Sequence, residues 1–297
     1  MYKVYTVDNI HEHPGYSTSV EYGSSTKSES DNTMRMSENH NAHISDEEII
    51  ERLRVRFQVL DDMTTAVKQG VVRALIVTGA AGVGKTHGVE GILSLQEADD
   101  AKFRKYEVVK GQMSPLMLYS KLHEYKDAGN VIVFDDCDSV LMDDVSLNIL
   151  KAALDSGERR VINWNTASKL LSTNDLPTSF EFEGAVIFIT NTKFENTKSE
   201  KLRPHLEAIE SRCHYLDLTI DTVREKMLRI RQVIDDGMLN KYMFDSEVEQ
   251  EIIDFVEENK DNLRGMSLRT VSKIADLRAA MPDTWRDVAR MTCMRGK

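Results

Sequence analysis

The stretch GAAGVGKT at residues 79–86 constrains the fold of this chain more than any other feature. It follows the apolar run Ala74-Leu75-Ile76-Val77 and precedes a segment, 86–96, that we expect to be helical. Glycines at 79, 82 and 84 let backbone N–H groups close around phosphate oxygens, where a side chain would obstruct the turn. A strand, a glycine-rich loop and a helix in this order predict the phosphate-binding loop of a nucleoside triphosphatase. The alternative is a glycine-rich turn that binds nothing.

Each polar residue of this loop has an expected role. Lys85 would reach the β and γ phosphates, and Thr86 would hold Mg²⁺ through its hydroxyl. The positive N-terminal end of the following helix would point at the anion. The residues expected to bind the nucleotide are Gly79, Ala80, Ala81, Gly82, Val83, Gly84, Lys85, Thr86 and His87.

A second motif lies about fifty residues further on, where the apolar run at 131–134 leads directly into Asp135-Asp136-Cys137-Asp138. Four apolar residues that end in acid predict a buried parallel strand whose C-terminal edge carries the site. We expect Asp135 to orient Mg²⁺ through water and Asp136 to polarise the attacking water. Taken alone, the acidic turn is also compatible with simple solvation.

Three further residues occupy positions that suit phosphoryl transfer. Asn191 ends the apolar strand at 185–190 and could orient the attacking water. Arg212 precedes a short strand at 214–218, and Arg269 lies at the start of an amphipathic helix. Either arginine could stabilise transition-state charge. Each is equally compatible with an ordinary surface ion pair.

The order of these elements resembles that of the AAA+ ATPases. The matching elements are Walker A at 79–86, Walker B at 131–136, sensor 1 at Asn191, the arginine finger at Arg212 and sensor 2 at Arg269. The resemblance spans residues 46–280, and stretches such as VIVFDDCDSVL and SRCHYLDLT are similar to AAA+ proteins encoded by tailed bacteriophages. One departure is that Asp136 stands where the family usually carries Glu. Hydrolysis could therefore be modest, or slow enough for the protein to act mainly as a nucleotide-dependent switch.

The resemblance and the alternation of predicted strands and helices imply the same fold class. We expect an α/β core with a five-stranded parallel sheet and helices on both faces, followed by a small all-helical lid. The expected divisions are a mostly disordered segment at 1–44, a nucleotide-binding domain at 45–218 and a lid at 219–297. Two short strands, at 159–164 and 180–183, are predicted to form a hairpin that projects from the core.

The family also implies partners and a task. ATP and Mg²⁺ are the expected ligands, and a homo-oligomeric ring or open spiral, with a hexamer as the expected number, would let Arg212 complete the neighbouring subunit's site. Arg203 competes with Arg212 for that role. The leading task is remodelling or movement of a macromolecule in phage DNA metabolism, as in helicase loading or a DNA motor. A protein remodeller of the MoxR kind and a slowly hydrolysing switch are the alternatives.

Charge and composition limit these options. The formal net charge of −11 argues against a protein that coats DNA, because non-specific affinity comes mostly from neutralised phosphates. Lys102, Arg104, Lys105 and Lys110 precede the turn at 111–113, and could grip DNA or protein in a central pore or form a solvated basic face. The sequence lacks an apolar run of the roughly 20 residues that a membrane helix needs. With an odd number of cysteines and no disulfide framework, we expect a cytoplasmic protein, in the host cytoplasm if it is phage-encoded.

Overall fold

The sheet predicted from the apolar runs is present in the computed structural model, which describes residues 44–95, 103–165, 171, 175–197 and 199–296. All neighbouring strands of the five-stranded sheet are parallel, in the order β2-β3-β6-β1-β7. Its strands are β1 (Ala74–Thr78), β2 (Lys105–Lys110), β3 (Asn130–Asp135), β6 (Ala185–Thr190) and β7 (His214–Asp217). The predicted strands are confirmed to within two residues at each end.

The strand order determines where a ligand can bind. Strand β1 lies between β6 and β7, so the chain that leaves β1 crosses to the far side of the sheet before it returns through β3 and β6. In open parallel sheets, ligands bind beyond the carboxyl ends of the strands at such a reversal of strand order. The loop at residues 79–84 begins at this point, directly after β1.

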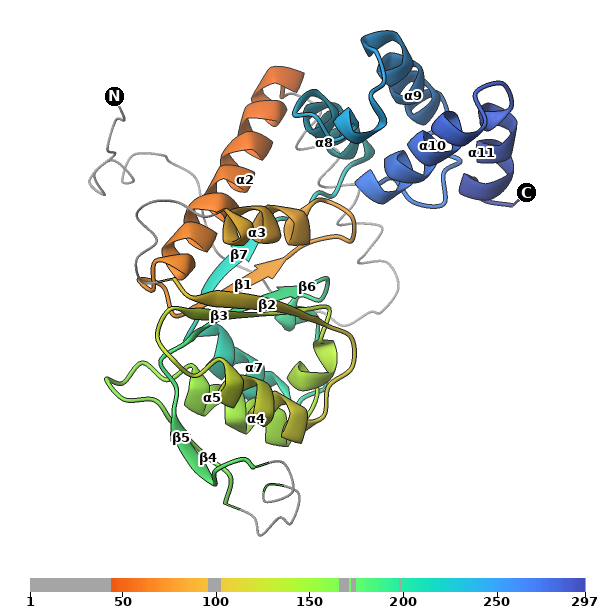
Figure 1. Ribbon diagram of the computed structural model, residues 1–297. Coiled ribbons are helices and arrows are strands. Elements are labelled where there is room, and N and C mark those ends of the chain that lie inside the picture. The colour runs from red at the N-terminus through yellow and green to blue at the C-terminus, as the bar shows by residue number, and fades with distance from the viewer. Residues whose placement is uncertain (1–43, 96–102, 166–170, 172–174, 198, 297) are drawn as a thin grey trace. The chain divides into compact units, whose positions relative to one another are not determined.

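Helices cover both faces of the sheet, because successive side chains of a strand point to opposite faces. On β1, Leu75 and Val77 pack with α2 (Asp46–Lys68) and α3 (Lys85–Ser94), while Ala74 and Ile76 belong to the cluster on the other face. That second cluster includes residues of α4 (Pro115–Glu124), α5 (Asp144–Ala153) and α7 (Arg203–Glu210). Figure 1 shows α2 and α3 on one side of the sheet and α4, α5 and α7 on the other.

The sequence explains where the first helix begins and ends. Ser45 is the N-cap of α2, and its hydroxyl accepts a hydrogen bond from the Glu48 N–H. At the other end Gly70 has a φ of +73°, and the N–H groups of Gly70 and Val71 donate to the carbonyls of Val67 and Ala66. These two bonds form a Schellman motif, which needs a left-handed residue at the glycine position.

The remaining elements are short or lie after the sheet. The predicted hairpin is confirmed as the antiparallel pair β4 (Val161–Asn163) and β5 (Ser179–Glu181). The chain after β7 is helical and buries an apolar cluster of its own, which includes Phe255 and Trp285. No helix among the described residues is long and apolar enough to cross a membrane. The other elements are η2 (Asp138–Leu141), η3 (Phe194–Asn196), α8 (Val223–Asp235), η4 (Asn240–Tyr242), α9 (Ser246–Glu258), α10 (Leu268–Ala280) and α11 (Trp285–Cys293).

Several sequence predictions fall on residues 1–43 and lie outside the described residues. They include the disorder expected for most of residues 1–44. Lys102 of the predicted basic cluster also lies outside the described part of the chain.

Candidate functional site

The loop after β1 is built around glycines in conformations that other residues rarely adopt. Gly79, Gly82 and Gly84 have φ angles of +146°, +75° and +107°. A Cβ at Gly79 would lie 2.9 Å from the backbone carbonyl carbon of Leu218, and one at Gly82 would lie 2.8 Å from the Ser267 Cβ. The torsion angles therefore favour glycine at all three positions, and close packing also requires it at Gly79 and Gly82.

Lys85 is the most connected side chain of the loop. Its ammonium donates to the carbonyl oxygens of Gly79 at 2.7 Å and Ala80 at 3.0 Å, and to the Asn191 Oδ1 at 2.8 Å. The side chain is buried, and this burial lowers the pKa of Lys85, while Asp136 and Asp135 act in the opposite direction. A buried cation at a strand-to-helix turn favours an anionic ligand.

Thr86, in the first turn of α3, lies beside Asp135 at the carboxyl end of β3. The Thr86 hydroxyl donates to the Asp135 carboxylate, with oxygen distances of 3.1 and 3.0 Å. Asp135 is 6% exposed, and the Lys110 ammonium lies 3.3 Å from its Oδ2. A hydroxyl and a carboxylate are the hard oxygen donors that Mg²⁺ prefers, so this pair fits the cation.

This donor set is small. The described residues contain no group of three or more His, Cys, Asp and Glu side chains that could hold a metal. Mg²⁺ at phosphate sites is held by one or two protein oxygens together with phosphates and water. Thr86 and Asp135 together meet that requirement.

Asp136 and Asn191 extend the site along the edge of the sheet. The Asn191 Nδ2 donates to the Asp136 Oδ1 at 2.8 Å, so the same amide joins Asp136 to Lys85. Asp136 has a φ of +53°, and its N–H donates to the Ile189 carbonyl at 2.9 Å. Both side chains are exposed. An exposed carboxylate held by an amide can accept a proton from water.

A residue without an expected role holds Asn191 in place. Asp138 accepts hydrogen bonds from the hydroxyls of Thr190 at 2.7 Å and Thr192 at 3.1 Å, the residues on either side of Asn191. The Thr192 N–H also donates to the Thr190 Oγ1 at 3.0 Å. The turn that presents Asn191 is therefore attached to the acidic turn after β3. In the sequence, the only signal for this contact is the cluster of aspartates at 135, 136 and 138.

Helix α10 brings Arg269 to the loop. The Leu268 N–H donates to the Gly82 carbonyl at 2.9 Å, and a Cβ at Gly82 would lie 3.6 Å from the Arg269 Cγ. The positive charge of Arg269 contributes to the lowered pKa of Lys85, after the larger effect of burial. The structure thus places Arg269 beside the loop.

The other loop residues named from the sequence lie in or next to the turn. Ala81 is exposed, Val83 is buried, and His87 is exposed in the first turn of α3. The first N–H groups of such a helix have no partner within the helix.

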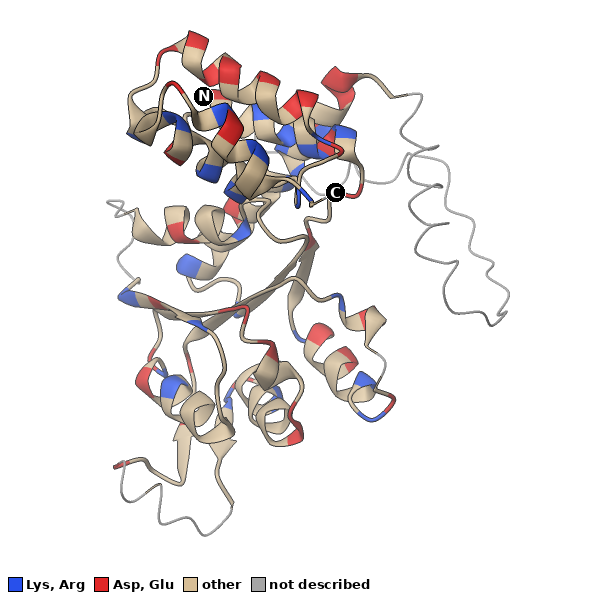
Figure 2. Ribbon diagram, turned by 90° about the vertical axis from the view of Figure 1, so that its right-hand side faces the viewer, with Lys and Arg blue, Asp and Glu red and all other residues tan. Residues whose placement is uncertain are grey.

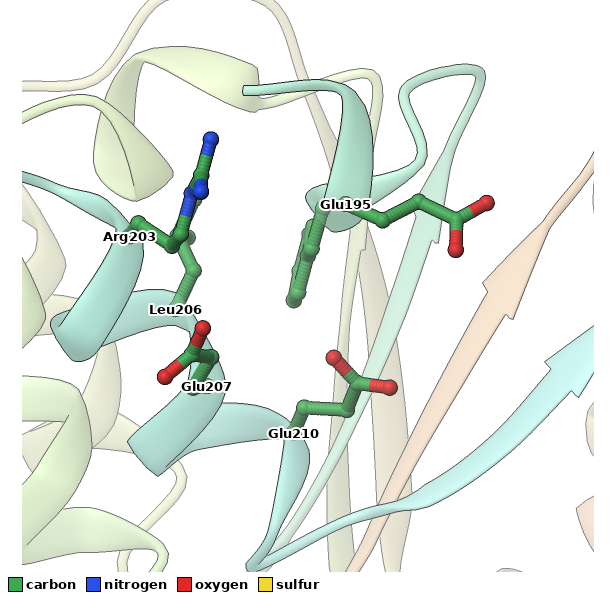
Figure 3. A pocket seen from close by; sticks show the side chains of 6 residues that line it. Glu195, Arg203, Leu206, Glu207 and Glu210 are labelled. Atoms are coloured by element: carbon green, nitrogen blue, oxygen red, sulfur yellow. The ribbon is translucent and has the colours of Figure 1, made fainter. Parts of the chain in front are cut away.

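The two candidate arginine fingers lie away from this cluster. Arg212 follows α7, and its Nη1 donates to the Ala208 carbonyl at 2.5 Å, while its buried Nε has no partner. Arg203 borders a cavity of about 280 Å³ together with Phe194, Glu195, Leu206, Glu207 and Glu210, as Figure 3 shows. No contact among the described residues joins either arginine to the loop at residues 79–84. Action on a neighbouring subunit stays a prediction.

The expected basic cluster before the turn at 111–113 is largely neutralised. Arg104 lies 3.8 Å from Asp127, Lys105 lies 4.0 Å from Glu124, and Lys110 lies 3.5 Å from Glu90. Figure 2 shows acidic and basic residues interspersed along the helices. For the described residues of the cluster, these pairs favour the solvated basic face over a grip on DNA.

Comparison with known proteins places the chain in a phage family. A protein of Enterobacteria phage T4, described as an uncharacterized 36.7 kDa protein in the nrdC-mobD intergenic region, is 36% identical over 246 residues. The match covers 82% of this chain and 75% of the phage T4 protein. This chain belongs to the family of that phage protein. No protein-family model matches the chain. The similarity therefore extends over most of this chain and most of the phage T4 protein.

Proposed function

We propose that this member of the phage family is an AAA+ ATPase that binds ATP with Mg²⁺ and hydrolyses it. One observation carries the proposal: Lys85, Thr86, Asp135, Asp136 and Asn191 converge at the carboxyl ends of three neighbouring strands. The loop glycines and the strand reversal at β1 support the same site. A plain structural turn does not need a lysine, a Thr–Asp pair and an Asn–Asp pair to meet there.

The residues divide the chemistry between them. Lys85 exchanges its bonds to the loop carbonyls for contacts to phosphate oxygens, and Thr86 with Asp135 holds the metal ion. Mg²⁺, when bound, neutralises negative charge on the phosphates. Asp136 accepts a proton from the attacking water, and Asn191 orients that water through its amide. Arg269 adds positive charge from α10, and thereby links the position of the C-terminal helices to the nucleotide.

The assembly and the task follow from the same proposal. The protein forms a ring, expected to be a hexamer, in which Arg212 of one subunit completes the site of the next. Its C-terminal helices act as the lid, and ATP turnover remodels or moves a macromolecule in the host cytoplasm. DNA is the leading client, and the phage relative supports a phage task.

The first test is steady-state ATP hydrolysis with and without single-stranded and duplex DNA, at two salt concentrations. Lys85→Ala is expected to abolish turnover, and Arg212→Ala is expected to abolish turnover while leaving nucleotide binding intact. Arg203→Ala is the comparison variant, because Arg203 begins α7 and Arg212 lies just after that helix, and Arg203→Ala should retain activity. Wild-type protein that turns over ATP no faster than Lys85→Ala would refute the ATPase proposal. DNA stimulation would assign the client, and indifference to DNA would direct the search to protein clients.

A further inference from the structure

Helix α8 places one arginine against the phosphate loop. The Arg229 guanidinium carbon lies 3.5 Å from the centre of the Phe57 ring, a residue of α2. The Arg229 Nη2 would lie 3.9 Å from a Cβ built at Gly84, the N-cap of α3. The Nη1 group donates to the Gln232 Oε1 at 2.6 Å. Stacking on Phe57 and the bond to Gln232 fix the guanidinium beside the loop.

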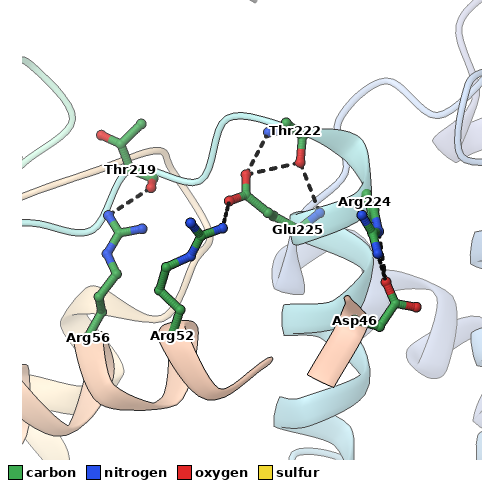
Figure 4. Close-up of polar contacts among 7 residues, drawn as sticks. All are labelled: Asp46, Arg52, Arg56, Thr219, Thr222, Arg224 and Glu225. Carbon is green, nitrogen blue, oxygen red and sulfur yellow. Dashed lines mark hydrogen bonds and ion pairs between the residues drawn. The ribbon is translucent and has the colours of Figure 1, made fainter. Parts of the chain in front are cut away.

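Contacts between α2 and the start of α8 hold this arrangement (Figure 4). Thr222 and Glu225 form a capping box at the N-terminus of α8. Arg52 of α2 lies 3.5 Å from the Glu225 carboxylate, and Arg224 donates to Asp46 at 2.7 Å. Helix α8 is therefore capped and attached to α2, so the position of Arg229 is set by packing.

The environment of Arg229 is short of negative charge. The buried Arg229 Nε has no hydrogen-bond partner, and no carboxylate of the described chain lies within 4.0 Å of the guanidinium. Burial lowers the pKa of Arg229 to about 10, while Asp236 and Asp61 raise it from a greater distance. The group stays cationic at neutral pH. Arg229 is half-buried, and a partly desolvated cation without a carboxylate partner favours an anionic ligand.

We propose that Arg229 is an additional phosphate-binding residue of the nucleotide site, donating from Nη2, the nitrogen beside Gly84, to a phosphate oxygen. This inference rests on the proposed nucleotide binding. Gly84 is the N-cap of α3, and the N-terminal end of a helix also attracts anions. The Arg229 guanidinium and the positive end of α3 therefore lie next to each other at Gly84. A guanidinium N–H forms a charge-assisted hydrogen bond to a phosphate oxygen, which is stronger than a neutral one.

The proposal is tested by direct binding of a fluorescent ATP analogue to the full chain, followed by its displacement with inorganic tripolyphosphate. Arg229→Gln is expected to weaken binding of both ligands by the same factor, about tenfold or more, because a charge-assisted bond is lost. Arg229→Lys keeps the charge but not the planar guanidinium that stacks on Phe57, and should lose affinity by a smaller factor. Arg231→Gln is the control, because Arg231 lies on the same helix and pairs with Glu257.

The outcomes separate this inference from the proposed function. Wild-type affinity in Arg229→Gln overturns the assignment of Arg229 alone, as does a loss for the analogue without a loss for tripolyphosphate, which would indicate a base contact. If Arg229→Gln does not fold by thermal melting, a folded Arg229→Lys protein with wild-type affinity overturns the assignment. Wild-type protein that binds the analogue no better than Lys85→Ala overturns the proposed function, and this inference with it.

Discussion

The contact between Asp138 and the two threonines beside Asn191 gives a prediction with a matched control. The Asp138 carboxylate accepts from the hydroxyls of Thr190 and Thr192 through separate oxygens, at 2.7 and 3.1 Å. In Asp138→Asn, only one oxygen remains, so one hydroxyl loses its acceptor. A hydrogen bond to a charged group contributes about 1.5–3 kcal/mol. Because Asp138 is half-buried, we expect the lower part of this range, about 1.5–2 kcal/mol.

Asp143→Asn is the control for this substitution. Asp143 is also half-buried, and its carboxylate caps α5 by accepting from the Ser146 N–H at 2.8 Å. Asn and Asp are about equal as N-caps, so this change should cost less than about 0.5 kcal/mol. Both variants keep the shape of the side chain and remove one formal charge. The difference between them therefore measures the loss of the second acceptor.

Urea denaturation of the three proteins measures these changes. A lower midpoint with an unchanged slope would show a loss of stability. The melting temperature of Asp138→Asn should fall by roughly 3–8 °C, at about 2–4 °C per kcal/mol for a chain of this size. The same variant should hydrolyse ATP more slowly with unchanged nucleotide affinity, because Asn191 loses its support. Equal stability of Asp138→Asn and Asp143→Asn would refute the reasoning.

The structure supports three further predictions. Thr86→Val should remove the Mg²⁺ dependence of nucleotide binding, measured by titrating the fluorescent analogue with and without the cation. Gly82→Ala should lower the free energy of unfolding by about 1–3 kcal/mol, because its φ is +75° and its Cβ would meet Ser267. Gly91 lies in open space on α3, so Gly91→Ala should instead raise the free energy of unfolding by about 0.5–1 kcal/mol. Urea denaturation of the two variants compares these changes. Burial alone would raise the pKa of Asp217, but hydrogen bonds from Lys193 and Thr219 outweigh it and hold the pKa below 3.8. Wild type should therefore be more stable than Asp217→Asn above pH 3.8, and lose this advantage as the pH falls through the lowered pKa.

The sequence was sufficient to predict the strands of the sheet, because apolar runs ending in polar residues have few other interpretations. Helix ends were less accurate: the sequence pattern predicts helices over 86–96, 115–127 and 145–156, and these end at Ser94, Glu124 and Ala153. Apolar or helix-compatible residues continue past each end, so periodicity alone does not show where the last turn stops.

Contacts between distant segments could not be predicted. Asp138 bonds to a residue 52 positions away, and Arg229 meets a loop that precedes it by well over a hundred residues. The sequence predicts helices after the sheet, but it does not say which side chain of α8 faces Gly84. Such contacts depend on how the helix is rotated against α2, which the Arg52–Glu225 pair and the capping box determine in three dimensions.

The shorter carboxylate at Asp136 is explained by its backbone. The AAA+ proteins that the sequence resembles usually carry Glu here, and loss of a methylene would be expected to leave the carboxylate short of the site. However, Asp136 is in a left-handed conformation, with its N–H bonded to the Ile189 carbonyl, and its Oδ1 lies 2.8 Å from the Asn191 amide. The aspartate therefore already reaches its partner. A glutamate on the same backbone would carry its carboxylate past the amide. The left-handed backbone after β3 therefore suits the shorter side chain of aspartate.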